Sequence, residues 1–141
     1  MQLKSRDKKQ SRLHRVGLFA GASSKALRNL AEAVEDVSVS AGHVLIKQGI
    51  HHHQSFVIDR GTATVDIDGR VVAELSDGDI VGELAYFAQE PATATVTAKT
   101  DLDALIIPHN RLDQVLENDP KFVRSIATEL AKRLIATDAL L

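Results

Sequence analysis

The residues with the clearest chemical potential lie between positions 75 and 98. In this stretch Gly82 and Glu83 precede a short apolar turn, and Glu90-Pro91 then leads into a run of small and β-branched residues. A glycine before a helical turn leaves backbone N–H groups that can donate hydrogen bonds to an anion. The pattern therefore predicts an anion site at a helix start, inside a segment that is otherwise rich in strands.

A second candidate is the run His51-His52-His53. In an extended chain only His51 and His53 share a side, and no nearby cysteine or acid completes a set of metal ligands. We interpret the run as a polar turn between strands and expect no metal site. The absence of cysteine also excludes disulfides, thiolate metal centres and a cysteine nucleophile. No set of nucleophile, base and orienting group is discernible either, so we do not expect an enzyme.

Length and charge limit the remaining classes. The 141 residues suit one domain, and a net charge of −2 excludes a broadly basic nucleic-acid binder. Residues 1–15 carry six basic side chains against one acid, so this arm has a charge of +5 and the rest of the chain −7. We expect a disordered basic arm over residues 1–12 and a single domain over residues 13–141. No apolar run reaches the ~20 residues that span a bilayer, and a signal peptide is not evident, which predicts a cytoplasmic protein without a membrane segment.

The elements that must position these residues follow from hydrophobic spacing. Apolar residues recur every three or four positions over residues 11–36, with an interruption at 17–24, which predicts two helical pieces, the second capped by Ser23 or Ser24. From about residue 37 to 107 short apolar runs alternate with glycines, which indicates an antiparallel roll, sandwich or barrel. Its clearest hairpin turns at Asp68-Gly69.

Two helices are predicted at the C-terminal end, over about residues 109–138. Pro108 ends the strand region, and the second helix begins near Asp119-Pro120. Its apolar stripe comprises Phe122, Ile126, Leu130, Leu134 and Leu141. A stripe of this kind packs either on the domain itself or on a second copy of the helix, and we leave both possibilities open.

Several motifs together resemble the cyclic nucleotide-binding domain family. They are the segments Ala41–Gly49, Phe56–Gly61 and Leu75–Gly82 with their spaced glycines, the motif Gly82–Ala85, and the final helix. The final helix is most similar to the dimerisation helix of catabolite-activator-type regulators. The resemblance implies an α+β fold, in which an antiparallel, jelly-roll-like β-roll is flanked by N-terminal and C-terminal helices. It also implies a phosphate-binding cassette that closes on cAMP or cGMP, and a homodimer formed through the C-terminal helix, which also acts as a lid.

The resemblance assigns ligand-binding roles by position. Glu83 matches the glutamate that accepts the ribose 2′-hydroxyl, a role suited to a carboxylate. The residues next to Glu83 match positions where small side chains let the ligand approach the backbone closely. Thr93 and Thr95 match the hydroxyl positions that follow in the family pattern. The remaining matched positions are Gly82, Leu84, Ala85, Thr93, Thr95 and, as a contact to the base, Thr137. Without the resemblance, Glu83 would be interpreted as a solvated loop carboxylate and the threonines as ordinary strand and helix residues.

Ala92 departs from the family pattern. The family has an arginine after the proline, where it contacts the cyclic phosphate, whereas here Pro91 is followed by alanine. A hydrogen bond to a charged group contributes about 1.5–3 kcal/mol. Residues 71–98 moreover contain five acids and neither lysine nor arginine. We therefore expect weak phosphate binding.

Three functions remain open. The first is a regulatory sensor domain of the cAMP and cGMP class with weakened phosphate binding. The second is an interaction or dimerisation domain that does not bind nucleotide, which Ala92 and the acidic stretch favour. The third is the sensor half of a transcription regulator or other effector. Because the resembling regulators continue into a helix-turn-helix after a position corresponding to Leu141, we expect no nucleic-acid binding from this chain.

Overall fold

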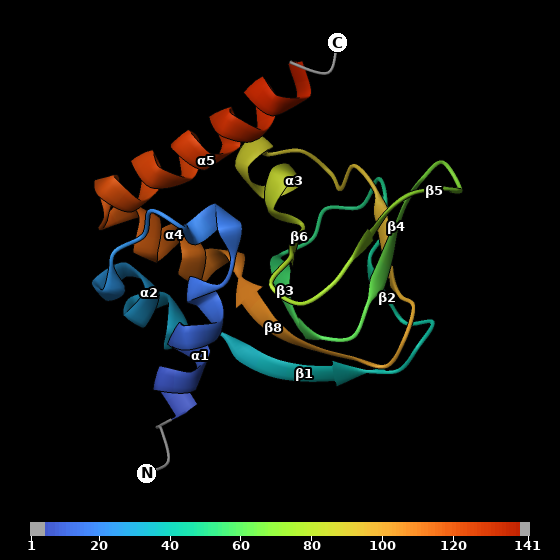
Figure 1. Cartoon of the computed structure of the whole chain (residues 1–141), viewed down its shortest axis with the longest axis horizontal. Helices are drawn as coiled ribbons and strands as arrows, with labels where there is room; N and C mark the ends of the chain where they lie inside the picture. Colours follow the sequence, from blue (N-terminus) through green and yellow to red (C-terminus); the bar gives the residue numbers. More distant parts are fainter. Residues whose placement is uncertain (1–4, 139–141) are drawn as a thin grey trace. The chain divides into compact units, whose positions relative to one another are not determined.

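The computed structural model describes residues 5–138. These residues form two compact units, one of strands over residues 34–110 and one of helices from the flanking segments up to Ala33 and from Arg111 onward (Figure 1). The expected α+β class is confirmed, since an antiparallel β-roll occupies the middle of the chain and helices occupy both ends.

The strand unit contains two four-stranded antiparallel sheets (Figure 1). One has the order β1-β8-β3-β6, and the other has the order β2-β7-β4-β5. The elements are β1 Glu35–Val39, β2 Val44–Ile46, β3 Gln54–Arg60, β4 Ala63–Ile67, β5 Arg70–Leu75, β6 Ile80–Val81, α3 Glu83–Ala88, β7 Thr95–Ala98 and β8 Leu102–Pro108. Each sheet therefore combines strands from the beginning and the end of the unit.

The predicted hairpin is confirmed. β4 pairs with β5 in an antiparallel register that sets Ile67 opposite Arg70, so Asp68 and Gly69 alone form the turn. Their φ angles are 54° and 81°, and two positive values are required by the two-residue turn that matches the twist of a hairpin. The Asp-Gly sequence thus sets the register of the sheet edge.

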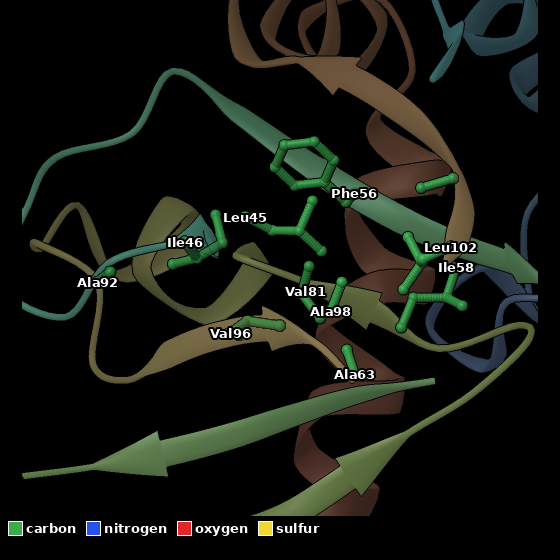
Figure 2. Close-up of a cluster of buried hydrophobic side chains, with 11 residues drawn as sticks. Leu45, Ile46, Phe56, Ile58, Ala63, Val81, Ala92, Val96, Ala98 and Leu102 are labelled. Carbon is green, nitrogen blue, oxygen red and sulfur yellow. The ribbon is translucent and has the colours of Figure 1, made fainter. Parts of the chain in front are cut away.

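The core of the strand unit lies between the two sheets. Figure 2 shows its side chains converging from several strands, with Val81 and Ala98 near the middle and Leu102 beside Ile58 at one side. The buried cluster consists of Leu45, Ile46, Phe56, Ile58, Ala63, Val81, Ala92, Val96, Ala98, Leu102 and Ala104. Small and β-branched aliphatic residues dominate, as the low aromatic content requires. Ala92, the residue that follows Pro91, is part of this core.

The helical unit contains α1 Ser5–His14, the 3-10 turn η1 Gly17–Phe19, α2 Ser24–Ala31, most of α4 His109–Glu117, and α5 Pro120–Asp138. The hydroxyl of Ser23 caps α2 by accepting a hydrogen bond from the Ala26 N–H. Phe19 and Phe122 meet edge to face with ring centroids 5.5 Å apart. Residues 5–10 are helical where the sequence predicted a disordered arm, whereas the rest of α1 agrees with the helical spacing predicted from residue 11. Burial of Leu13 together with good helix formers such as lysine and glutamine accounts for the difference.

The apolar stripe of α5 divides into two parts. Phe122 and Ile126 are buried, whereas Leu134 is 63% exposed and its neighbour Ile135 67% exposed. Leu141 lies outside the described residues. The first half of the stripe therefore belongs to the core of the helical unit, and pairing of the second half with another copy stays a prediction. Within the described part of the chain, no helix has the length and apolar character needed to cross a membrane.

Candidate functional site

A sharp turn links β6 to the six-residue helix α3. Gly82 adopts a φ of 84° as the residue before the helix, so Glu83 occupies its first turn. A Cβ at Gly82 would lie 3.4 Å from both Ser55 Oγ and Ile46 Cδ1. Gln89, with a φ of 58°, ends the helix, and the Glu90 N–H donates to the Ala85 carbonyl. The positive φ therefore favours glycine at position 82. The space that a side chain would take there is bordered by Ser55 and Ile46.

A cavity of about 210 Å³ opens between this turn and the second sheet. Its lining is mainly apolar, with one carboxylate and one hydroxyl among the described side chains. The lining residues are Ile46, Val65, Leu75, Ile80, Val81, Gly82, Glu83, Leu84, Ala85, Ala92, Thr93, Ala94 and Val96. An apolar cavity with a small number of polar groups is the usual form of a small-molecule site.

The structure brings together six of the eight positions assigned from the sequence. Gly82, Glu83, Leu84, Ala85, Ala92 and Thr93 all line this cavity. Thr95 lies next to it on β7 but is not among the lining residues, and its Oγ1 accepts a hydrogen bond from the Gln48 N–H at 3.0 Å. Thr137 lies on α5 in the helical unit and donates to the Arg133 carbonyl at 3.0 Å. The ligand-binding role of each position stays a prediction.

Two backbone hydrogen bonds fix the position of Ala92. Its N–H donates to the Ile50 carbonyl at 2.9 Å, and its carbonyl accepts from the Gly49 N–H at 2.8 Å. The side chain is 7% exposed. The position is therefore fixed relative to β2 and the cassette, which we define as residues 82–95.

A second cavity, of about 230 Å³, shares Ala92 and three other lining residues with the first. The shared residues are Ile46, Gly82, Ala85 and Ala92, and the others are His51, His52, Tyr86, Gln89, Glu90 and His109. His51 and His52 lie in the loop between β2 and β3, which confirms the polar turn. Among the described residues, no group of three or more histidine, cysteine, aspartate or glutamate side chains could hold a metal ion.

Sequence reasoning missed the contacts around His109. Its Nε2 lies 2.8 Å from Ser55 Oγ, and its ring centroid lies 4.5 Å from that of Tyr86. Ser55 and His109 are 54 positions apart, and neither belongs to a local motif. Only the pairing of β3 with β8, which sets Gln54 opposite Pro108, brings them together.

The segment from residue 71 to 98, which contains the cassette, carries a net negative charge. Glu74, Asp77, Asp79, Glu83 and Glu90 lie between residues 71 and 98, where lysine and arginine are lacking. Lys99, the next basic residue, is paired with Glu74 at 3.0 Å. The lysine charge is thus directed to an acid on β5 rather than to the cavity.

Comparison with known proteins adds an independent observation. The family model "Cyclic nucleotide-binding domain" matches residues 36–119. The chain is 31% identical over 117 residues to a cAMP-dependent protein kinase regulatory subunit of Schizosaccharomyces pombe, an alignment that covers 82% of this chain and 28% of that protein. It is 25% identical over 131 residues to a CRP-like cAMP-activated global transcriptional regulator of Mycobacterium tuberculosis, covering 89% of this chain and 58% of that protein.

A solved structure matches over nearly the full length of both chains. It is the N-terminal domain of a transcriptional regulator from Streptomyces coelicolor A3(2), with a TM-score of 0.76 and 27% identity, and the alignment covers 92% of this chain and 94% of that one. The two sequence relatives are longer, since the chain spans between about a quarter and three-fifths of their lengths.

Proposed function

Because the chain belongs to the cyclic nucleotide-binding domain family, we propose that it acts as a regulatory sensor domain of the cAMP and cGMP class in which Ala92 weakens binding of the cyclic phosphate. One observation carries this proposal. The cavity lined by Gly82, Glu83, Leu84 and Ala85 also includes position 92, and an alanine there has no group to contact an anion.

The residues that line the cavity are better suited to bind the ribose of a cyclic nucleotide than its phosphate. The Glu83 carboxylate can accept a hydrogen bond from a ribose hydroxyl, and Thr93 adds a hydroxyl to the lining of the same cavity. The aliphatic side chains of Val65, Leu75 and Val96 give the base an apolar surface. Neither lysine nor arginine is present among the described residues that line the cavity.

Ligand occupancy would be sensed by the cassette helix. Tyr86 on α3 contacts His109, the residue at which α4 begins. A ligand that binds one arrangement of α3 better than another shifts the population toward that arrangement. Because Tyr86 contacts His109, this shift would change the surroundings of the His109 ring. We also propose that the exposed part of α5 pairs two copies of the chain as a homodimer.

Isothermal titration of cAMP and cGMP into the unchanged chain and the Ala92→Arg variant tests the proposal. We expect weak binding to the unchanged chain, and a gain of about 10- to 100-fold with arginine, because a charge-assisted hydrogen bond is restored. Ala92→Gln is the matched control, since it adds a long polar side chain without charge and should gain little. Tight binding to the unchanged chain would contradict the role of position 92, and a variant Ala92→Arg that still binds neither nucleotide would favour the interaction-domain function.

A further inference from the structure

We propose that the second cavity, which His51, His52 and His109 line together, binds a small planar organic cation of the guanidinium class. The bound cation supplies the positive charge that Ala92 lacks. Occupancy of the cavity does not depend on the proposed function, whereas the effect of the cation on nucleotide affinity rests on it.

The charge of the second cavity favours a cation. Glu90 is the one acid among the described residues that line it, and neither lysine nor arginine is among them. The Glu90 N–H donates to the Ala85 carbonyl at 3.0 Å, but the Glu90 side chain makes no hydrogen bond or ion pair to another described residue. A carboxylate attracts a cation more strongly in a partly enclosed cavity than in open water. The Glu90 carboxylate is therefore available to a positively charged ligand.

The aromatic and polar lining indicates which kind of cation fits. The rings of Tyr86 and His109, with centroids 4.5 Å apart, form one wall. A guanidinium ion is planar, stacks on aromatic rings and donates five hydrogen bonds in its plane, two of which can go to one carboxylate. Neutral imidazole and amide groups, which accept such bonds, belong to His51, His52 and Gln89. A metal ion fits less well, because no three histidine, cysteine, aspartate or glutamate side chains of the described residues could hold one.

The second cavity borders the cavity proposed for the nucleotide. Ile46, Gly82, Ala85 and Ala92 line both. Because Ala85 and Ala92 have only methyl side chains, little protein separates a cation in one cavity from a phosphate in the other. Opposite charges attract most strongly where water is excluded. Each ligand therefore raises the affinity of the chain for the other, and by the same factor.

Ethylguanidinium and ethylurea are matched probes, because they have nearly the same shape and differ in charge. Tyr86 is the one tyrosine of the chain, so its ring resonances report on this cavity in an NMR titration at constant ionic strength. We expect ethylguanidinium to shift these resonances with an affinity about tenfold or more above that of ethylurea. Circular dichroism at the same concentrations checks that the chain stays folded. Equal affinities of the two probes would overturn the inference.

A pair of variants tests the role of the carboxylate. Glu90→Gln keeps a similar shape but loses the charge, and should weaken ethylguanidinium binding about tenfold. Glu74→Gln is the matched control, since Glu74 belongs to the same acidic segment but is not among the described lining residues of either cavity. It should leave the affinity unchanged. A Glu90→Gln chain that binds ethylguanidinium as tightly as the unchanged chain would contradict the site.

Titration of cAMP and cGMP with and without saturating ethylguanidinium measures the coupling. We expect a gain of about fivefold or more for at least one nucleotide, and no gain with ethylurea or in Glu90→Gln. In Ala92→Arg the ion should change nucleotide affinity much less, because the arginine already supplies the charge. An ion that binds without changing nucleotide affinity in the unchanged chain would overturn the role as a counter-charge.

The same measurements separate this inference from the proposed function. If ethylguanidinium does not bind but Ala92→Arg gains nucleotide binding, the inference is wrong and the proposed function stands. If ethylguanidinium binds through Glu90 but neither the unchanged chain nor Ala92→Arg binds a nucleotide, the cation site stands and the proposed function is wrong.

Discussion

Ser55 Oγ and His109 Nε2 lie 2.8 Å apart, and this hydrogen bond joins β3 to the first residue of α4. Ser55 is 1% exposed, and it lies directly under Gly82. The His109 ring contacts Tyr86 on α3 in turn. The cassette helix is thus connected to the sheet through a histidine that the sequence places far from both.

Removing the Ser55 hydroxyl should destabilise the chain. We expect Ser55→Ala to lower the free energy of unfolding by about 1–3 kcal/mol, because the buried hydrogen-bond partner of His109 is lost. Ser38→Ala is the matched control, since its hydroxyl donates to Asp103 at 2.6 Å on an exposed part of the same sheet, and it should change stability by less than about 0.5 kcal/mol. Urea unfolding of both variants measures the difference, and equal effects would contradict a special role for the buried pair.

Gly61 is predicted to be intolerant of any side chain. It has a φ of 96°, and a Cβ there would collide with the Asp101 carbonyl and crowd Thr100. Gly42 has a similar φ of 92°, but no atom lies within 4 Å of the corresponding Cβ. Gly42→Ala should therefore lose about 1–2 kcal/mol from backbone strain alone, and Gly61→Ala should lose a further 1–3 kcal/mol or so from overpacking. Thermal or urea unfolding will rank the two variants, and a Gly61→Ala chain as stable as Gly42→Ala would show that the loop relaxes.

The exposed part of α5 provides a test of self-association. If two copies pair through Leu134 and Ile135, Leu134→Glu should shift a dimer toward the monomer in light scattering, because a charge would be buried in the interface. Ala136→Glu adds the same charge to the neighbouring exposed surface and serves as the control. Neither substitution should change the secondary structure measured by circular dichroism. A monomeric unchanged chain at high concentration would remove the basis for the proposed dimer.

Local signals in the sequence predicted local features well. The Asp68-Gly69 turn could be predicted because two positive φ angles are needed there and these residue types tolerate them. The cassette residues from Gly82 to Ala85 could be placed together because they are contiguous and resemble a known motif. Each of these predictions depended on a few neighbouring residues. The structure has the predicted turn at Asp68-Gly69 and the predicted helix start after Gly82.

Features that depend on distant pairing could not be predicted. The contact between Ser55 and His109 depends on the register of β3 against β8, which is set by the whole sheet. The first part of α1, residues 5–10, was missed because its charged composition resembles a solvated arm, while the burial of Leu13 depends on packing against other helices of its unit. Similarly, the sequence did not predict that His51 and His52 line one cavity together with His109, which is more than 50 positions away.

The small side chain of Ala92, which lines both cavities, has a consequence for the design of chemical probes. Two cavities of about 210 and 230 Å³ both have Ala92 in their lining, and its methyl group stands where the family pattern proposed from the sequence has an arginine. If a cyclic nucleotide binds as proposed, an analogue with a short, uncharged substituent directed past position 92 would extend from one cavity toward the other. A relative with arginine at that place would exclude the substituent sterically. Such a compound would discriminate between this chain and the arginine-bearing domains that share its fold.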